Sequence, residues 1–529
     1  MVAYTLYIPT AGIGSRLGSL TSSCNKSLMT VGTQPVLWKI IQKAMQTKYP
    51  VERVVIALGF NGAQVKELFE HVNLGVDLEF VNVDPFEGEG SGLGETLRQS
   101  RKYLQSPFIF WACDALVESE IPLKMTNWVA VSRKSLTDEY RSVTYNNYQV
   151  EAINDKGFSF DTESSTQVAT YAGICGVVDT DLFWSTFDQA QESTNVGEVA
   201  GLRGLVPSLE VIEVEWADIG SEERLREIQQ QELRASQEIH VLPKDGEAIW
   251  FFGDTVVKFA TDQLFISNRT ERSKALADYV PKVVQITDHM YSYNKQPGTV
   301  LSKCVDLDVF INLMEHSRVF WKRNELTITQ LNNFRKTCLN FYRDKTINRL
   351  NQFWALTSEV DGGEIINGVE IPSLESMLAQ INWENLSSGV PVRFHGDFHF
   401  ENILYSEDIR NFVFLDWRQD FGGNIEIGDI YYDLAKLLHG LYIPHASVVL
   451  EKFSLEKLDD GSRIAWIDRP EDYSHYETYL NLWTNENGLD FRRVQILAAL
   501  VLLNIAPLHH KGYREFLYVE GKRRLSECV

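Results

Sequence analysis

Cysteine is scarce in this chain of 529 residues, and its six cysteines form no CxxC pair. The absence of such a pair excludes the common zinc and redox motifs, and the scattered cysteines favour a reducing compartment. Long apolar runs are also missing, since the longest, residues 496–503, falls far short of the ~20 residues of a membrane helix. The first twelve residues lack the charged and apolar regions of a signal peptide. We therefore expect a cytoplasmic protein without membrane insertion.

Positive charge is in deficit, with 50 Lys and Arg against 72 Asp and Glu and a formal net charge of −22. A surface this acidic repels polyanions, which predicts no nucleic-acid partner but leaves room for a small anion in a local basic pocket. The hydrophobic share of 44% and the charged share of 23% are typical of a soluble globular protein. The length predicts two to four domains.

The first half alternates strand-like and helix-like segments. This alternation predicts a mostly parallel, doubly wound Rossmann-like α/β sheet with helices on both faces. Strands are expected at residues 5–9, 53–58, 78–83 and 107–112, and helices at 36–47 and 62–71. The charged, Gln-rich stretch 221–238 predicts a helix that leads into a linker. We place the domain boundary there, giving domains 1–238 and 239–529.

The second half begins with a different pattern. Residues 248–252 and 255–259 flank Gly253-Asp254 and predict a β-hairpin, with a helix around 271–279. From about residue 328 the chain is expected to be mainly helical, interrupted by one strand–turn–strand insert at 392–417.

A glycine-rich turn follows the first predicted strand. It contains Ala11, Gly12, Gly14 and Ser15, and glycines there let backbone N–H groups approach phosphate oxygens. Arg16 and Lys26 would add the positive charge that a triphosphate needs, and we assign both to catalysis. The pattern is neither a dinucleotide fingerprint nor a Walker loop, because the third glycine is displaced and no GK[ST] follows.

This stretch resembles the first loop, GxG[ST]R and then Pro-Lys, of nucleotidyltransferases that act on sugar phosphates and phosphocholine. Asn25 stands where that family has proline, so the loop is expected to differ in shape. Further matches follow in the family's order: residues 57–60 to a strand-end element, 90–96 to the base-recognition turn, and 215–221 to a late WxD[IT]G element. The resemblance implies that Gly94 and Thr96 bind the nucleotide.

Two aspartates fit the chemistry of nucleotidyl transfer. Asp114 is the last residue of the predicted buried strand 108–114, and Asp218 lies in the late element. Ligands bind at the carboxyl ends of strands in open α/β sheets, and Mg²⁺ is held by one or two carboxylates together with phosphates. We predict that both aspartates bind Mg²⁺; the alternative is that Asp114 caps a loop and Asp218 caps the helix after it.

The second half contains the spacing HxDxxxxN, with Asp397 and Asn402. It resembles the catalytic loop of aminoglycoside phosphotransferases and choline kinases, which implies a bilobal, protein-kinase-like α+β domain. In such a loop Asp397 would take the proton of the acceptor hydroxyl, and Asn402 would bind Mg²⁺.

A second metal ligand is expected from the next strand. Asp416 directly ends the apolar run 411–415 and precedes a tryptophan, as in the family's IDW element. Four residues later, Asp420 opens a DFG sequence that matches protein kinases. We assign the metal to Asp416, because Asp420 lies beyond the strand.

The same resemblance assigns four further roles. Lys258 would bind ATP phosphates as a catalytic lysine, although an ordinary surface-strand lysine is the alternative. Glu271 would form the ion pair that holds Lys258, and Tyr293 would lie in the hinge that contacts ATP. Asp433, in a GD…YDLA element, would brace the catalytic loop.

Together these motifs predict a bifunctional enzyme. It would phosphorylate a small hydroxyl compound with ATP and then couple the phosphate to an NMP from a second NTP, CTP or UTP/GTP, releasing pyrophosphate. The expected partners are small molecules and nucleotides, Mg²⁺ is the expected cofactor, and the sequence leaves a homo-oligomer open. The product would be an NDP-activated precursor for surface polysaccharide.

Two alternatives stay open at this point. The acceptor is either a sugar or an amino-alcohol such as choline or ethanolamine, activated with CTP for lipid or glycan decoration. Choline would need an aromatic cage, for which Trp354, Trp417, Tyr431 and Tyr432 are candidates. The other alternative is that one domain is catalytic and its neighbour is a binding or regulatory module.

Overall fold

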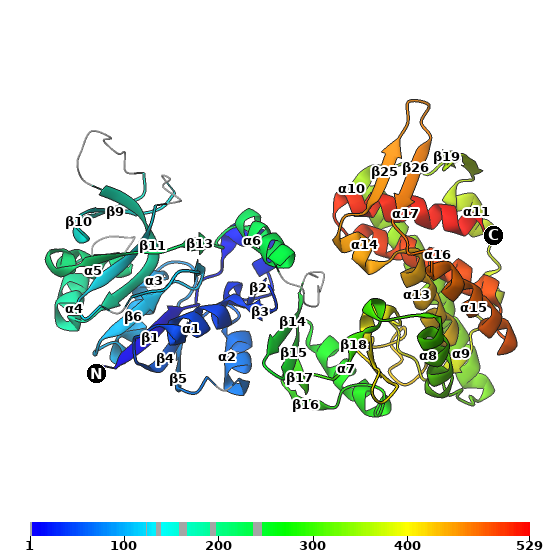
Figure 1. The fold of residues 1–529 in the computed structure, drawn as a ribbon, viewed down its shortest axis with the longest axis horizontal. Coiled ribbons are helices and arrows are strands. Elements are labelled where there is room, and N and C mark those ends of the chain that lie inside the picture. Colours follow the sequence, from blue (N-terminus) through cyan, green and yellow to red (C-terminus); the bar gives the residue numbers. More distant parts are fainter. Residues whose placement is uncertain are drawn as a thin grey trace. The chain divides into compact units, whose positions relative to one another are not determined.

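The computed structural model describes residues 3–72, 74–122, 124–133, 139–157, 167–190, 197–235 and 246–529. The chain divides into two compact units, whose helices and strands are labelled in Figure 1. The first unit comprises Met1–Gln263 with Ile286–Ser292, and the second comprises Leu264–Gln285 with Tyr293–Val529. The predicted boundary near residue 238 lies outside the described residues, so the domains 1–238 and 239–529 stay a prediction.

A nine-stranded sheet is the centre of the first unit, with strand order β5-β4-β1-β6-β11-β8-β12-β10-β9. Strands β5, β4, β1 and β6 are parallel to one another, and β11 then joins β6 antiparallel. The sheet is therefore mixed, and the expectation of a mostly parallel sheet is wrong: among the described strands only β5, β4, β1 and β6 form a parallel run, and β12 pairs parallel with β8. The strands are β1 (Tyr4–Pro9), β4 (Val51–Leu58), β5 (Asp77–Asn82), β6 (Phe108–Trp111), β8 (Trp128–Ser132), β9 (Ser142–Asn146), β10 (Gln149–Asn154), β11 (Gln167–Val177) and β12 (Glu210–Glu213).

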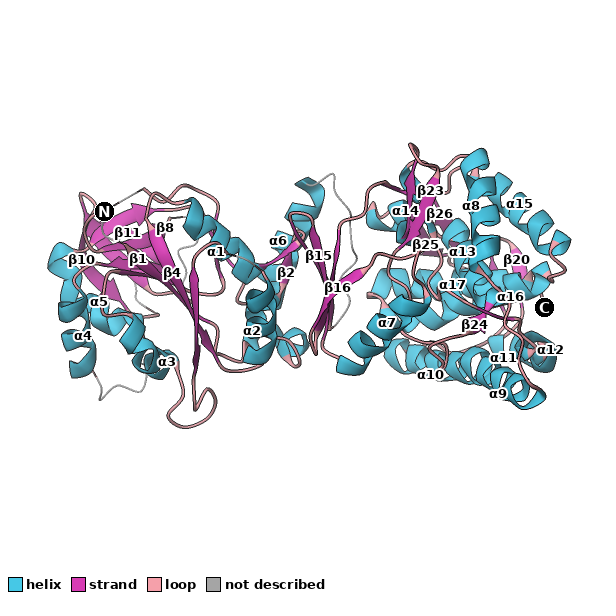
Figure 2. Ribbon diagram, turned by 90° about the horizontal axis from the view of Figure 1, so that it is seen from below, coloured by secondary structure: helices cyan, strands magenta, loops and turns pink. Residues whose placement is uncertain are grey.

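Helices cover both faces of this sheet, because its central strands are apolar along most of their length and successive side chains point to opposite faces. On β1, Leu6 and Ile8 share one core cluster with α1 and α2, whereas Tyr7 faces the opposite cluster with α3, α4 and α5. Figure 2 shows the strands in magenta between cyan helices. This arrangement confirms the predicted doubly wound fold. The helices are α1 (Val36–Gln46), α2 (Gly62–His71), α3 (Leu93–Ser100), α4 (Thr180–Gln189), α5 (Glu198–Leu205) and α6 (Glu222–Ala235).

The predicted hairpin forms as β14 (Glu247–Phe252) and β15 (Thr255–Ala260), paired antiparallel. Trp250 packs into the same apolar cluster as α1 and donates from Nε1 to Thr30 Oγ1 at 2.9 Å. The amide of Phe251 donates to the carbonyl of Thr33 at 3.0 Å. A hairpin that the sequence places at the start of the second domain is thus packed as part of the first compact unit.

The second unit is mainly helical, as predicted. Its first helix begins earlier than expected, at Gln263 rather than near Glu271. The expected insert forms as the antiparallel pair β22 (Ile403–Ser406) and β23 (Asn411–Phe414), with β18 (Thr299–Val300) beside β22. The helices are α7 (Gln263–Ala275), α8 (Leu307–Phe320), α9 (Ile328–Leu339), α10 (Lys345–Thr357), α11 (Leu374–Gln380), α12 (Trp383–Ser387), α13 (Ile430–Tyr442), α14 (His445–Val449), α15 (Tyr473–Glu486), α16 (Phe491–Ile505) and α17 (Lys511–Ser526).

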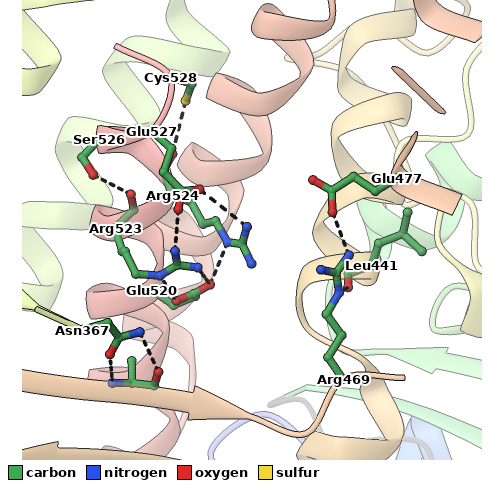
Figure 3. A network of polar contacts seen from close by, with 11 residues as sticks. Asn367, Leu441, Arg469, Glu477, Glu520, Arg523, Arg524, Ser526, Glu527 and Cys528 are labelled. Carbon is green, nitrogen blue, oxygen red and sulfur yellow. Dashed lines mark hydrogen bonds and ion pairs between the residues drawn. The ribbon is translucent and has the colours of Figure 1, made fainter. Parts of the chain in front are cut away.

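A second sheet in this unit was not predicted, and the expectation of a single strand–turn–strand insert is wrong. Its order is β20-β19-β26-β25, formed by β19 (Glu364–Ile366), β20 (Val369–Ile371), β25 (Phe453–Lys457) and β26 (Arg463–Ile467). Asn367 joins the two hairpins by exchanging hydrogen bonds with the backbone of Ala465, and Glu520 on α17 pairs with Arg523 and Arg524 (Figure 3). The sheet was missed because its hairpins are about ninety residues apart and each strand is short.

One stretch, Phe491–Leu508, is long and apolar enough to cross a membrane by length and composition. Two thirds of it is buried inside the protein, 67%, where α16 packs against α13 and α17. A buried core helix of a globular protein has the same composition. We interpret α16 as the central helix of the second unit.

Candidate active sites

The turn after β1 has the backbone geometry of a close approach. Gly14 has a φ of +73°, and an added Cβ would lie 3.1 Å from the Cβ of Lys26, so glycine is required there. Gly12 has open space around its Cα, and a side chain would meet nothing within 4 Å. Ala11 is buried, and Ser15 begins a 3₁₀ segment, Ser15–Thr21. Of the two glycines, only Gly14 occupies a position where the backbone conformation and the neighbouring side chains require glycine.

Asn25, which replaces the family's proline, holds the end of this loop. Its buried side-chain amide donates to the carbonyls of Thr10 at 3.0 Å and Phe60 at 2.7 Å. Its Oδ1 accepts from the backbone N–H and the hydroxyl of Ser27. The backbone N–H of Asn25 donates to Gln64 Oε1 at 3.1 Å, a bond that proline could not make. These hydrogen bonds therefore fix the backbone directly before Lys26.

Lys26 and Asp114 form an ion pair in the first unit. Lys26 Nζ lies 3.0 Å from Asp114 Oδ2, and both side chains are about one fifth exposed, at 20% each. Burial raises the pKa of Asp114, but the charges of Lys26 and Arg16 outweigh it and leave the pKa below its usual value. Asp114 is thus a carboxylate at neutral pH.

Asp218 is brought beside Asp114 by strand pairing. It ends β13 (Trp216–Asp218), which runs antiparallel to β7 (Ala115–Val117) and places Asp218 opposite Ala115. Gly220 leaves room for Arg16, since an added Cβ would lie 2.7 Å from Arg16 Nη2 and 2.8 Å from Asp218 Oδ1. The predicted Arg16, Lys26, Asp114 and Asp218 therefore gather at one place.

Two residues that sequence reasoning missed also contact Asp218. Its Oδ2 accepts from the Tyr140 hydroxyl at 2.6 Å and from Arg224 Nη1 at 2.9 Å. Burial and the neighbouring charge of Asp114 raise the pKa of Asp218. Arg224 lies in the stretch interpreted as a helix leading to a linker, and nothing in its local pattern pointed to a carboxylate partner.

In the described residues no hydrogen bond joins Gly94 or Thr96 to Arg16, Lys26, Asp114 or Asp218. Both are buried on α3, where Thr96 Oγ1 donates to the carbonyl of Gly92 at 3.0 Å. Their assignment to the nucleotide stays a prediction.

Asp433 braces the catalytic loop of the second unit, which confirms its predicted role. It is fully buried, and its carboxylate accepts from the backbone N–H groups of His395 at 2.7 Å and Gly396 at 2.6 Å. Trp321 Nε1 donates to it at 2.9 Å. Burial raises the pKa of Asp433 to about 6, against the lowering effect of these hydrogen bonds.

Replacing Asp433 by asparagine should destabilise the second unit. The Asp433→Asn amide would set an NH₂ group against N–H donors, and we expect a loss of about 2–4 kcal/mol in free energy of unfolding. Denaturant unfolding measures this loss. The exposed Asp459→Asn serves as the matched control and should change stability by less than about 0.5 kcal/mol. Equal losses in the two variants would contradict a bracing role.

The structure brings Asp397, Asn402 and Asp416 together. Asn402 Nδ2 donates to Asp397 Oδ2 at 3.1 Å and to the carbonyl of Asp397 at 2.9 Å. The backbone N–H of Leu415 donates to the carbonyl of Asn402 at 2.7 Å, which places Asp416 next to the loop. Asp420 instead accepts from Gly423 in a turn. This geometry favours Asp416 over Asp420 as the metal ligand.

The face of α7 toward this site carries arginines. Arg269 forms an ion pair with Asp416, and its carbonyl accepts from Trp417 Nε1 at 2.9 Å. Arg272 donates to three backbone carbonyls, among them that of Phe394 at 2.6 Å, and burial lowers its pKa to about 9. Helix α7 is thus held against the segment that contains Asp416 and Arg418 by the guanidinium groups of Arg269 and Arg272.

Glu271 has a partner other than the predicted one. It is exposed on α7 and its Oε2 lies 2.5 Å from Lys274 Nζ. Lys258 is only 6% exposed on β15, opposite Ile249, so it is no ordinary surface lysine. Tyr293 is buried on β17 (Met290–Asn294). The roles of Lys258 and Tyr293 toward ATP stay predictions.

The proposed aromatic cage for choline has no common centre. Trp417 is fully buried against Arg269, Tyr431 is covered by the Arg493 guanidinium 3.9 Å from its ring centroid, and Trp354 Nε1 contacts Tyr518. Tyr432 packs among Phe341, Tyr342 and Phe421. No ring contact among the described residues joins two of these four candidates, and Trp354 is only partly buried.

Sequence reasoning also missed the cation closest to Asp397. Lys436 on α13 places Nζ 2.7 Å from Asp397 Oδ1, and it is largely buried. It lies three residues after Asp433 on the same helix, so the element that braces the loop also supplies this charge.

Part of this unit matches a known protein family. Residues 342–466 match APH, the phosphotransferase enzyme family. The match contains Asp397, Asn402 and Asp416 and confirms the predicted resemblance to aminoglycoside phosphotransferases. No curated protein matches the chain.

Several solved structures are similar to the N-terminal part of this chain. UDP-glucose pyrophosphorylase complexed with UDP-glucose is 15% identical with a TM-score of 0.37, covering 45% of this chain and 100% of that one. CTP:phosphocholine cytidylyltransferase from Streptococcus pneumoniae is 18% identical with a TM-score of 0.34, covering 44% and 99%. Inositol-1-phosphate CTP transferase from T. maritima is 18% identical with a TM-score of 0.34, covering 43% and 97%.

Proposed function

We propose that the second unit phosphorylates the hydroxyl group of a small molecule with ATP. The observation that carries this proposal is the hydrogen-bonded pair of Asp397 and Asn402 beside Asp416, inside a segment that matches the phosphotransferase family. Asp397 would orient the hydroxyl and accept its proton as the oxygen attacks the γ-phosphorus. Asn402 and Asp416 offer the oxygen ligands that Mg²⁺ prefers, and the bound ion would neutralise charge on the phosphates.

We propose further that the first unit transfers a nucleotidyl group to the phosphate made by the second. Arg16 and Lys26 would bind the triphosphate and stabilise the charge that develops on the leaving pyrophosphate. Asp114 and Asp218 form a carboxylate pair, a donor set that suits Mg²⁺. The support for this step is the gathering of these four residues beyond the ends of β1 and β6.

The two steps would yield an NDP-activated building block, and we propose its use in surface polysaccharide. Six free cysteines and the use of ATP suit the cytoplasm. The second candidate, in which only one unit is catalytic, is less favoured because each unit retains its own charged set.

Phosphorus NMR on the full chain tests the proposal. The protein is mixed with Mg²⁺, the four NTPs and a pool of sugars, hydroxy acids and amino-alcohols. We expect a new phosphomonoester, then a new pyrophosphate diester with free pyrophosphate. A phosphomonoester alone would contradict the role given to the first unit, and a diester formed only from supplied phosphomonoesters would contradict the role given to the second.

A further inference from the structure

Three cations near the catalytic loop have no carboxylate partner. Lys345, Arg349 and Arg418 form no ion pair within 4.0 Å in the described part of the chain, although acidic residues outnumber basic ones by 72 to 50. Arg349 donates only to Gln352, and Arg418 donates from Nε to the carbonyl of Asp420. In so acidic a protein, unpaired cations at one place suggest a site for an external anion.

These cations are held by the catalytic loop and by a helix irregularity. The backbone N–H of Arg418 donates to the carbonyl of His395 at 2.9 Å, and Arg418 packs so closely on Gly396 that an added Cβ would lie 2.5 Å from it. Lys345 directly follows a π-helical segment, Asn340–Asp344, a feature often found at functional sites. Lys345 Nζ and Arg418 Cζ lie 4.2 and 5.1 Å from the centroid of the Phe341 ring.

The cations also repel one another, which an anion would relieve. Burial and the charges of Arg418, Arg349 and Lys436 lower the pKa of Lys345 to about 7. Lys436 is the residue whose Nζ lies 2.7 Å from Asp397, so this field extends to the catalytic carboxylate. Lys436, which contacts Asp397, and the three cations around Lys345 outnumber the two carboxylates beside them, Asp397 and Asp420. This excess of positive charge disfavours a cationic substrate.

We propose that the acceptor of the kinase is an anion, namely an alcohol that carries its own carboxylate or phosphate, held by Lys345, Arg349 and Arg418 while its hydroxyl meets Asp397. This inference rests on the proposed kinase activity and narrows its substrate class. In the reaction, a bond forms between the hydroxyl oxygen and the γ-phosphorus, and the bond from that phosphorus to ADP breaks. The hydroxyl proton passes to the Asp397 carboxylate, and the acceptor's own anionic group is unchanged. Choline and ethanolamine are disfavoured because they are cations, and choline also because no ring contact among the described residues joins two of its four aromatic cage candidates.

Phosphate binding to the full chain tests this site without turnover. The protein is saturated with Mg²⁺ and ADP, and the line width of inorganic phosphate is followed by phosphorus NMR at constant ionic strength. We expect broadening by the wild type and an affinity about 10-fold weaker in Lys345→Gln and Arg349→Gln, since each removes a charge-assisted bond. Lys336→Gln, exposed on the preceding helix α9, is the control and should bind phosphate as the wild type does.

Competition then identifies the anionic group. D-Glycerate and glycerol phosphate should displace inorganic phosphate, and the stronger of the two shows whether a carboxylate or a phosphate is preferred. Glycerol and choline should displace none.

Several results would overturn the inference. They are no broadening at up to about 50 mM phosphate, equal binding by the Lys345 and Arg349 variants, or displacement by choline or glycerol as strong as by the anions. A loss of ADP affinity in the two variants would assign the cations to the nucleotide instead. Failure of the wild type to bind ADP at all would refute the kinase proposal itself, which separates the two failures.

Discussion

Replacing Asp397 by asparagine is expected to lower ATP-dependent phosphorylation by about 10²–10⁴-fold, the contribution of a positioned general base. Asparagine keeps one of the two oxygens that now accept from Asn402 Nδ2 at 3.1 Å and from Lys436 Nζ at 2.7 Å. The loop is also held by the bond from Asn402 Nδ2 to the Asp397 carbonyl and by the bond from the His395 N–H to Asp433. The loop should therefore retain its shape while it loses the group that takes the proton. Release of ADP in the presence of the acceptor measures the effect.

The exposed Asp408→Asn is the matched control for this variant. Asp408 lies in the turn between β22 and β23, the hairpin that follows the catalytic loop, and its loss should change the rate by less than about twofold. Nucleotidyl transfer to a supplied phosphomonoester should be the same in wild type, Asp397→Asn and Asp408→Asn. A full phosphorylation rate in Asp397→Asn would remove this residue from the mechanism.

The sequence was most informative where function depends on local spacing. Asp397 and Asn402 are five residues apart in one loop, and the hydrogen bond between them follows from that spacing. The parallel strands were also readable, since β1 and β4 carry continuous apolar runs, as buried parallel strands do. The expectation that Asp114 and Asp218 meet rested on resemblance, and antiparallel pairing of β7 with β13 supplies the physical reason.

Contacts between distant segments could not be predicted in the same way. Lys345 and Lys436 belong to helices about ninety residues apart, and neither lies in a recognisable motif. In a single sequence a lysine on an amphipathic helix is indistinguishable from a solvated one, because its surroundings come from other elements. Asn25 illustrates the same limit: its departure from the family's proline was visible, but the carbonyls of Thr10 and Phe60 that it binds were not.

The anionic acceptor also bears on the second reaction. The product of the kinase step would carry two anionic groups, one new phosphate and the acceptor's own. At the first unit the new phosphate would meet Arg16 and Lys26, of which Lys26 is already paired with Asp114. The arrangement is therefore nearly balanced in charge before the nucleotide binds, and we expect binding of a triphosphate there to depend on a divalent cation.

Replacing Asp114 by asparagine should reduce nucleotidyl transfer by about 10³-fold, because it removes a carboxylate ligand for the metal. The amide oxygen can still accept from Lys26 Nζ, which now lies 3.0 Å from the carboxylate, so the loop after β1 should keep its position. Raising Mg²⁺ should recover part of the loss if the carboxylate acts through the metal.

Glu118→Gln is the control for this variant, since Glu118 is exposed just beyond β7 and should affect the rate by less than about twofold. Pyrophosphate release from NTP and a supplied phosphomonoester measures the reaction, and ATP-dependent phosphorylation by the second unit should be unchanged. Asp397→Asn and Asp114→Asn would then each stop one half-reaction and spare the other, as two independent sites require. If Asp114→Asn left pyrophosphate release intact, the first unit would be a binding module, and the phosphorylated alcohol would be the final product of this chain.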